Sequence, residues 1–212
     1  MLGFREHIAI EGPIGAGKTT LATILSRELG AQLVLEQPED NPFLPDYYKD
    51  RERWALQTQL IFLLSRHREQ LSLKQLNMFQ EGVVTDYIYE KDAIFAKLAL
   101  DEREYSLYSL IADRLAADII NPSLIVYLQS TPERLMTNIR IRDREYERDM
   151  SVDYIKDLCE LYNRFFSVWD RTPVLIVRTT EIDFVGNEMH RLKLVEKVKS
   201  LNEGRVVFDP EE

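Results

Sequence analysis

The sequence predicts an α/β fold in which helices surround a five-stranded parallel sheet, because short β-branched runs alternate with longer helical patterns. The predicted strands span His7 to Glu11, Gln32 to Glu36, Val83 to Asp86, Leu124 to Leu128 and Val174 to Thr179. With 212 residues, 45% of them hydrophobic, the chain is long enough to bury a substantial core. No repeat or linker divides the sequence, and we expect a single domain over residues 1–212.

Each predicted strand is followed by a segment with a helical pattern. The first helix follows a glycine-rich turn and runs to about Leu29, where Gly30 provides a stop signal. Further helices are expected from about Arg51 to Leu76, Tyr89 to Leu100, Arg103 to Ile119, from Pro132 onward and from Ser151 through Trp169. Proline and acidic residues crowd the stretch QPEDNPFLPD, Gln37 to Asp46, which predicts a loop at the mouth of the sheet.

The composition argues against several classes of protein. The 36 acidic and 27 basic residues give a net charge of -9, which opposes binding to a nucleic-acid polymer. The sequence has no apolar run long enough for a membrane span, and MLGFREHIAIEG does not resemble a secretory signal, so we expect a cytoplasmic protein without a membrane partner. Cys159 is the one cysteine and the three histidines are scattered, so neither an internal disulfide nor a zinc site is expected.

The stretch GPIGAGKTT directly follows the first predicted strand and matches the phosphate-binding pattern G-x-x-x-x-G-K-[ST]. It consists of Gly12, Pro13, Ile14, Gly15, Ala16, Gly17, Lys18, Thr19 and Thr20. In a strand–turn–helix context, successive backbone N–H groups of such a turn cradle phosphate oxygens. We expect Lys18 to reach the β- and γ-phosphates of ATP and the Thr19 hydroxyl to bind Mg²⁺.

A GTP-dependent switch is disfavoured as the use of these phosphates. The sequence contains no N-K-x-D motif for reading a guanine base. Its one D-x-x-G, Asp183 to Gly186, follows the last predicted strand, where it cannot serve the γ-phosphate. The motif therefore favours phosphoryl transfer.

Glu36 is the candidate general base. It ends the second predicted strand, at the carboxyl edge where open α/β sheets bind their ligands, and a carboxylate there can take the proton of an attacking hydroxyl. An ordinary acidic residue at a strand end is the alternative. Glu39 and Asp40 follow closely and would repel a phosphorylated acceptor, so an acceptor with a free hydroxyl fits better.

Gln59 lies within an apolar stripe of the predicted helix that begins at Arg51, so its amide should be partly buried. A buried amide needs partners, which a purine or pyrimidine edge, the backbone or water could provide. Arg66, seven residues later, faces the same way and is expected to form a structural ion pair.

The run NIRIRDREYER, Asn138 to Arg148, predicts either a solvated helix face or a mobile lid. Alternating acids could pair with its arginines on the surface. The segment also precedes the Ser151 cap, the place where P-loop kinases carry a lid, and arginines there would neutralise charge in the transition state. We favour the lid.

These motifs together resemble the deoxynucleoside kinases, and within them the bacterial deoxyadenosine/deoxyguanosine kinases. The resemblance extends over IAIEGPIGAGKTTLA, LEQPEDNPFLPDYYKD, RWALQTQLIFLLSR, TDYIYEKDAIFAKLAL, PSLIVYL and IRDREYERDMSVDYI. It implies a P-loop kinase fold with a five-stranded parallel sheet and an arginine-rich lid, a homodimer, and transfer of phosphate from ATP, with Mg²⁺, to the 5′-hydroxyl of a purine deoxynucleoside.

The same resemblance implies roles for individual residues. Glu36 matches the general base and Gln59 the amide that reads the nucleobase. Tyr48 and Glu147 match residues that bind the sugar 3′-hydroxyl, and the remaining matches are Arg142 and Arg144 for the lid arginines and Asp86 for the acid of a Glu/Asp-Arg-Ser motif. For Tyr48, core packing is the alternative, and for Asp86 a helix cap.

Two positions depart from the family pattern. Tyr87 stands where many members have arginine, and it cannot hold phosphate charge as arginine can; Asn138 replaces an earlier lid arginine. Asp92 lies near a base-contacting acid of relatives, although the segment differs in length by one residue. The segment 179–185 resembles a loop that holds the adenine of ATP.

Two alternatives remain open at this point. A nucleoside monophosphate kinase would use deoxynucleoside monophosphates and no free nucleoside. A regulatory module would bind ATP, contact a protein partner through its lid arginines and transfer no phosphate.

Overall fold

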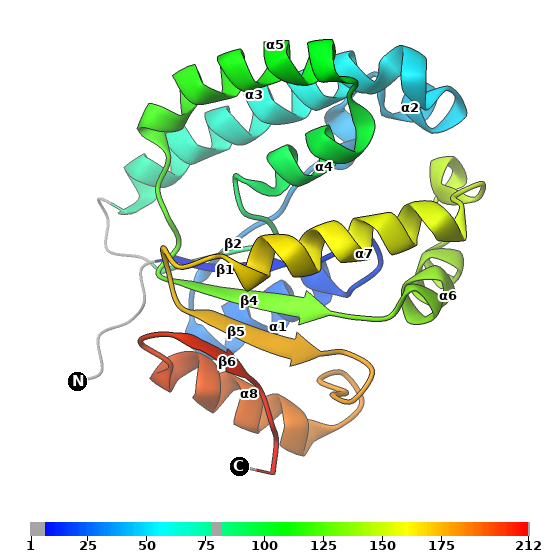
Figure 1. Cartoon of the computed structure of the whole chain (residues 1–212). Helices are drawn as coiled ribbons and strands as arrows, with labels where there is room; N and C mark the ends of the chain where they lie inside the picture. The colour runs from blue at the N-terminus through cyan, green and yellow to red at the C-terminus, as the bar shows by residue number, and fades with distance from the viewer. Residues whose placement is uncertain (1–6, 78–81, 212) are drawn as a thin grey trace.

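The computed structural model describes residues 7–77 and 82–211, which form one parallel sheet covered by helices (Figure 1). The sheet has six strands in the order β2-β3-β1-β4-β5-β6, one more than predicted. The strands are β1 (His7–Glu11), β2 (Gln32–Val34), β3 (Val83–Thr85), β4 (Leu124–Gln129), β5 (Val174–Arg178) and β6 (Arg205–Val207). The missed strand β6 has three residues at the sheet edge, too few for a readable alternation.

The helices begin close to the residues expected from the capping signals. They are α1 (Lys18–Leu29), α2 (Leu44–Lys49), α3 (Arg51–Asn77), α4 (Lys91–Ala99), α5 (Glu102–Leu115), α6 (Pro132–Arg142), α7 (Val152–Ser167) and α8 (Glu188–Ser200). Gly30 ends α1 in the left-handed conformation, with φ 62°, and the side chains of Thr131 and Ser151 cap α6 and α7.

The predicted loop over Gln37 to Asp46 is more ordered than expected. It contains a 3₁₀ turn, η1 (Pro38–Asp40), and the first turn of α2. Two further 3₁₀ turns, η2 (Ala116–Asp118) and η3 (Glu145–Glu147), follow α5 and α6. Pro38 and Pro45 explain the difference. Proline interrupts a helix at interior positions, but it is well suited to the first turn, where both of these prolines lie.

The core lies on both faces of the sheet. Helix α7 packs over one face, with α3, α4 and α5 stacked beyond it, and α1 and α8 cover the other face (Figure 1). The buried residues of α7 recur at helical spacing, and Phe166 stacks on Tyr127 of β4 with ring centroids 4.3 Å apart. No described helix is both long and apolar enough to cross a lipid bilayer.

The strand order determines where a ligand can bind. β1 lies in the middle of the sheet, paired in parallel with β3 on one side and β4 on the other, so chain connections diverge at its carboxyl end. Crevices of this kind are the usual ligand sites of open α/β sheets. The ends of β1, β2 and β3 bring the glycine-rich turn, Glu36 and Asp86 to this edge.

Candidate active site

The turn between β1 and α1 has the geometry of a phosphate-binding loop. Gly15 adopts φ +82°, and a Cβ there would lie 2.9 Å from the Leu135 carbonyl oxygen. At Gly12 a Cβ would lie 2.7 Å from the Leu128 carbonyl oxygen. Both positions therefore exclude a side chain. The Lys18 ammonium folds back over the turn and donates to the carbonyl oxygens of Gly12 and Pro13, at 2.7 and 3.0 Å.

A buried carboxylate, Glu11, supports this turn from below. It accepts hydrogen bonds from the Gly12 N–H at 2.9 Å, the Ile88 N–H at 2.8 Å and the Tyr162 hydroxyl at 2.9 Å. Burial raises the pKa of Glu11, and the nearby ammonium groups of Lys91 and Lys18 oppose that shift. Glu11 thereby joins the phosphate loop to α7 and to the segment after β3.

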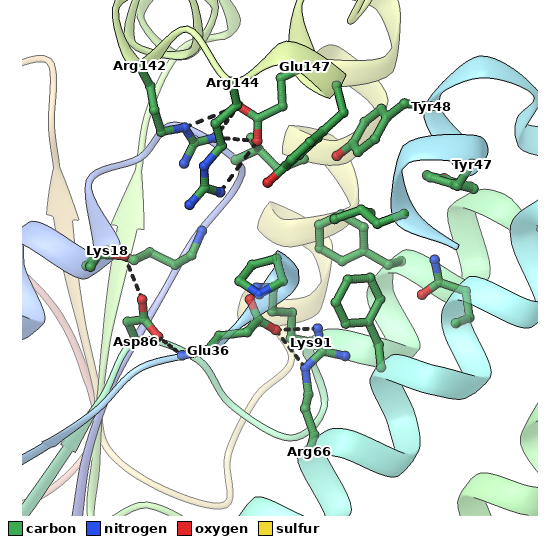
Figure 2. A pocket seen from close by; sticks show the side chains of 18 of the residues that line it. Lys18, Glu36, Tyr47, Tyr48, Arg66, Asp86, Lys91, Arg142, Arg144 and Glu147 are labelled. Atoms are coloured by element: carbon green, nitrogen blue, oxygen red, sulfur yellow. Dashed lines mark hydrogen bonds and ion pairs between the residues drawn. The ribbon is translucent and has the colours of Figure 1, made fainter. Parts of the chain in front are cut away.

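Asp86 connects the phosphate loop with Glu36. One of its carboxylate oxygens accepts from the Thr19 hydroxyl at 2.6 Å, and the other accepts from the Glu36 backbone N–H at 2.8 Å (Figure 2). A hydroxyl beside a carboxylate provides the hard oxygen ligands that Mg²⁺ prefers, and Mg²⁺ usually takes further oxygens from phosphates. Thr19 and Asp86 therefore fit a magnesium ion bound together with a nucleotide.

Glu36 stands two residues beyond the end of β2, since the strand stops at Val34, and its carboxylate is held by two cations (Figure 2). Arg66 of α3 donates to one oxygen from Nε and a terminal nitrogen, at 3.0 and 2.6 Å, and Lys91 of α4 donates to the other oxygen. Burial by itself would raise the pKa of Glu36, but Lys91 and Arg66 outweigh that effect and lower the pKa to about 2. Glu36 is therefore a carboxylate at neutral pH.

The expected ion pair of Arg66 is confirmed, and it is double. Besides Glu36, Arg66 binds Asp92, which also accepts from the Tyr108 hydroxyl at 2.8 Å. Asp92 lies behind Arg66 and does not itself line the cavity. Burial raises the pKa of Asp92 to about 6 in spite of the opposing effects of Arg66 and Tyr108.

Gln59 lines the cavity and is 2% exposed. Its amide oxygen is buried and accepts no hydrogen bond from the described residues. An unpaired buried amide oxygen is costly unless a ligand donates to it. The aromatic rings of Phe62 and Phe95 line the same cavity, so it offers an apolar slot with one polar end.

The far end of the cavity is aromatic and acidic. Tyr48 lines it and stacks on Tyr146 of η3, with ring centroids 5.5 Å apart. Glu147, 4% exposed, lines it too. Burial raises the pKa of Tyr48, and the neighbouring Glu147 raises it further, so the phenol stays protonated and able to donate. Tyr48 and Glu147 thus both offer polar groups to this end of the cavity (Figure 2).

The arginines of the run 138–148 have two kinds of surroundings, the cavity and the protein surface. Arg142 donates to Glu147 at 2.6 and 2.7 Å, and Arg144 pairs with Glu39 of η1 at 2.9 Å; both arginines line the cavity. Arg148, by contrast, pairs with Asp143 on the surface. Arg142 and Arg144 therefore line the cavity and Arg148 belongs to a solvated face, while a lid over the site stays a prediction.

A second cavity adjoins the first. Four residues line both cavities: Lys18, Thr19, Arg142 and Arg144. We call the cavity that contains Glu36 the acceptor cavity and the other the donor cavity. Ile182, Phe184 and Val185 line the donor cavity, as does Asn138, whose amide donates to the Gly15 carbonyl oxygen at 2.8 Å.

Most of the predicted site residues meet at these cavities, but two predicted substrate-binding residues, Tyr87 and Asp92, line neither of them. Tyr87 is 1% exposed and lines neither cavity, so the structure does not bring it together with the other predicted substrate-binding residues. The prediction also left out Lys91, which lines the acceptor cavity. The sequence signal that could have identified Lys91 was its place at the start of a helix, where a positive charge is unfavourable because it opposes the helix dipole.

A parallel α/β sheet, a phosphate loop after its central strand and a cavity with a carboxylate on the other side of that loop define a P-loop phosphotransferase. Comparison with known proteins makes the class more specific. The family model described as Deoxynucleoside kinase matches residues 8–203, and the chain belongs to the deoxynucleoside kinase family.

Individual relatives match most of this chain. A deoxyadenosine kinase of Dictyostelium discoideum is 35% identical over 187 residues, 86% of this chain and 75% of the relative. A deoxyguanosine kinase of Bacillus subtilis (strain 168) is 34% identical over 200 residues, 92% of this chain and 96% of the relative. A solved structure of deoxyadenosine kinase from M. mycoides with bound dATP is 25% identical, with a TM-score of 0.79 over 92% of this chain and 100% of that chain.

Proposed function

We propose that this protein transfers the γ-phosphate of ATP to the 5′-hydroxyl of a purine deoxynucleoside, deoxyadenosine or deoxyguanosine. The observation that carries the proposal is the meeting of the two cavities at Lys18 and Thr19, with Glu36 in the acceptor cavity. A nucleotide bound along the phosphate loop would present its terminal phosphate at this junction. An alcohol in the acceptor cavity would then lie between that phosphate and Glu36.

The acceptor cavity fits an uncharged nucleoside better than a nucleoside monophosphate. Apart from Lys18, its cations are already paired: Arg66 with Glu36 and Asp92, Lys91 with Glu36, Arg142 with Glu147, and Arg144 with Glu39. The phosphate of a monophosphate acceptor would have to share these four cations with their carboxylates. The planar base would lie between the aromatic side chains, with its polar edge toward Gln59 and the sugar toward Tyr48 and Glu147.

The proposed reaction assigns one step to each group. Glu36 accepts the proton of the 5′-hydroxyl as that oxygen bonds to the γ-phosphorus. Little proton transfer is needed early in a loose phosphoryl-transfer transition state, so a carboxylate with a low pKa suffices as the base. Lys18 and the lid residues Arg142 and Arg144 face the phosphates and offset their charge. A magnesium ion on Thr19 and Asp86, when bound, would neutralise phosphate charge.

A substrate panel tests the proposal. Purified protein, ATP and Mg²⁺ would be incubated with deoxyadenosine, deoxyguanosine, deoxycytidine or thymidine, and with the monophosphate of each, while ADP formation is followed. We expect turnover within the range of about 1 to 100 per second on a purine deoxynucleoside. Turnover on monophosphates alone would establish the monophosphate kinase instead, and ATP binding without any turnover would establish the regulatory module.

We also propose a cytoplasmic homodimer. Leucines on two contacting helices support this assembly: Leu64 and Leu71 on α3 are 40% and 41% exposed, and Leu107 and Leu110 on α5 are 47% and 60% exposed. Such a surface favours burial against a second copy. Light scattering after size-exclusion chromatography should give twice the chain mass of 24.9 kDa.

A further inference from the structure

Lys91 occupies an unusual position in the acceptor cavity. It is the first residue of α4 and only 7% exposed, although a cation at a helix N-terminus is disfavoured and a buried ammonium is costly without a counter-charge. Its one acceptor among the described residues is the Glu36 carboxylate. An ammonium group has three N–H donors, so this single pairing leaves Lys91 able to bind a further oxygen.

The other cations near Glu36 have more partners. Arg66 is shared between Glu36 and Asp92, and Lys18 donates to two carbonyl oxygens of the phosphate loop. Lys91 of α4 donates to the Glu36 oxygen that Arg66 does not bind, and it lies near enough to Lys18 for the two charges to repel. Lys91 and Lys18 both line the acceptor cavity, so the Lys91 ammonium and the phosphate loop border the same space.

Proton transfer to Glu36 removes the negative charge beside the Lys91 ammonium. In the transfer, the 5′-oxygen bonds to the γ-phosphorus, the bond from that phosphorus to the bridging oxygen of ADP breaks, and the hydroxyl proton moves to Glu36. The carboxylate then becomes neutral, and the buried Lys91 ammonium loses the one charged group to which it donates a hydrogen bond, with only the more distant charge of Glu11 remaining. The newly transferred phosphoryl group keeps the negative charge that it carried in ATP and is then a nearby anion.

From this geometry we infer that Lys91 is a catalytic cation that changes partners during the reaction, from Glu36 in the free enzyme to the phosphoryl group as it is transferred. Asp86 already holds the Thr19 hydroxyl and the Glu36 N–H, and Tyr87 next to it is buried without lining the cavity. Lys91 is therefore the cation that the segment after β3 contributes to the acceptor cavity. The inference rests on the proposed function and names a residue that the proposed roles did not include.

Steady-state kinetics of Lys91→Met test the inference first. We expect kcat on the best deoxynucleoside to fall by about 100-fold, with the KM values for ATP and nucleoside changed by less than about threefold. Lys97→Met is the matched control, because Lys97 is an exposed lysine of the same helix, and its kcat should match that of the wild type. An unchanged kcat in Lys91→Met would overturn the inference.

Product binding separates a catalytic cation from a residue that only positions Glu36. Lys91→Met should bind the deoxynucleoside monophosphate about 10-fold more weakly than the wild type, while its affinity for the deoxynucleoside changes by less than about threefold. Lys91→Arg, which keeps the charge, should retain most of the affinity for the monophosphate. Equal losses for both ligands in Lys91→Met would assign Lys91 a positioning role and overturn the inference.

A double variant keeps the test valid if Lys91→Met does not fold. Glu36→Gln/Lys91→Met removes both charges of the pair together, so neither is left buried alone. Its residual turnover should be about 10-fold below that of Glu36→Gln alone, because Lys91 acts on the phosphoryl group and not only through Glu36. Equal turnover in the two variants would overturn the inference. The wild-type protein tests the proposed function in the same assay, so failure there is distinguishable from failure of the Lys91 variants.

Discussion

The donor and acceptor cavities meet at Lys18, yet they are built in opposite ways. The phosphate loop of the donor side is one contiguous segment, shaped by glycine backbone and by hydrogen bonds within the loop. The acceptor side combines side chains from α2, α3, α4 and η3 with the segments after β2 and β3, held mainly by paired charges. This difference teaches that phosphate binding is determined locally, whereas selection and activation of the acceptor depend on long-range packing.

The largest effect should come from removing the proton acceptor. Glu36→Gln keeps the side-chain shape but not the charge, so we expect kcat to fall by about 100-fold or more while the KM for ATP stays within about threefold. Asp40→Asn, an exposed acid of η1 outside both cavities, is the control. If Glu36→Gln weakened ATP binding as much as it lowered kcat, the assignment of ATP and the acceptor to separate cavities would be wrong.

A buried histidine at the opposite end of the sheet differs from Glu36 in its surroundings. The charge of Glu36 is paired with cations, whereas the surroundings of the histidine disfavour its charged form. His7 lies 3.1 Å from the Thr85 hydroxyl, its other ring nitrogen has no partner among the described residues, and burial lowers its pKa from 6.5 to about 4. Below pH 6.5 the unfolded chain binds a proton that folded His7 refuses until about pH 4, so stability falls as the pH drops through this range.

The linked loss attributable to His7 between pH 7 and pH 5 is about 2 kcal/mol. Urea denaturation at both pH values should show a pH-dependent loss that is smaller by this amount in His7→Gln than in the wild type. The same pH dependence in both proteins would show that His7 titrates normally in the folded state.

A smaller effect is expected at the base-binding end of the acceptor cavity. Gln59→Leu removes the amide that would meet the nucleobase, and we expect the KM for the deoxynucleoside to rise about 10-fold with the KM for ATP unchanged. Gln57→Leu, an exposed glutamine of the same helix, should behave like the wild type. If Gln59→Leu instead raised the KM for ATP, the assignment of the two cavities would be wrong.

The sequence was most informative where the determinants are contiguous. The parallel sheet, the phosphate loop and the caps of α1, α6 and α7 follow from short motifs, and the structure has each of them. The three-residue strand β6 was missed because its place depends on pairing with β5 rather than on its own pattern. Glu36 was placed at a strand end, but it lies two residues further on, tied to Asp86 across 50 positions of the chain.

The partners of charged residues were the hardest part of the site to predict. Lys91 and Arg66 reach Glu36 from 55 and 30 residues away, so no local pattern joins them. Tyr87 shows the opposite error: a position assigned from neighbouring motif residues points into the core. Residue type and order therefore identified the chemistry of the acceptor cavity, while only packing determined which charges pair there.

A crystal structure of the protein with deoxyadenosine and a non-hydrolysable ATP analogue tests the central claim most directly. We expect the 5′-oxygen within about 2.6 to 3.2 Å of a Glu36 carboxylate oxygen. That oxygen should also lie in line with the terminal phosphate above Lys18. A nucleoside whose 5′-oxygen lies away from Glu36, with that carboxylate still bound to both Arg66 and Lys91, would contradict it.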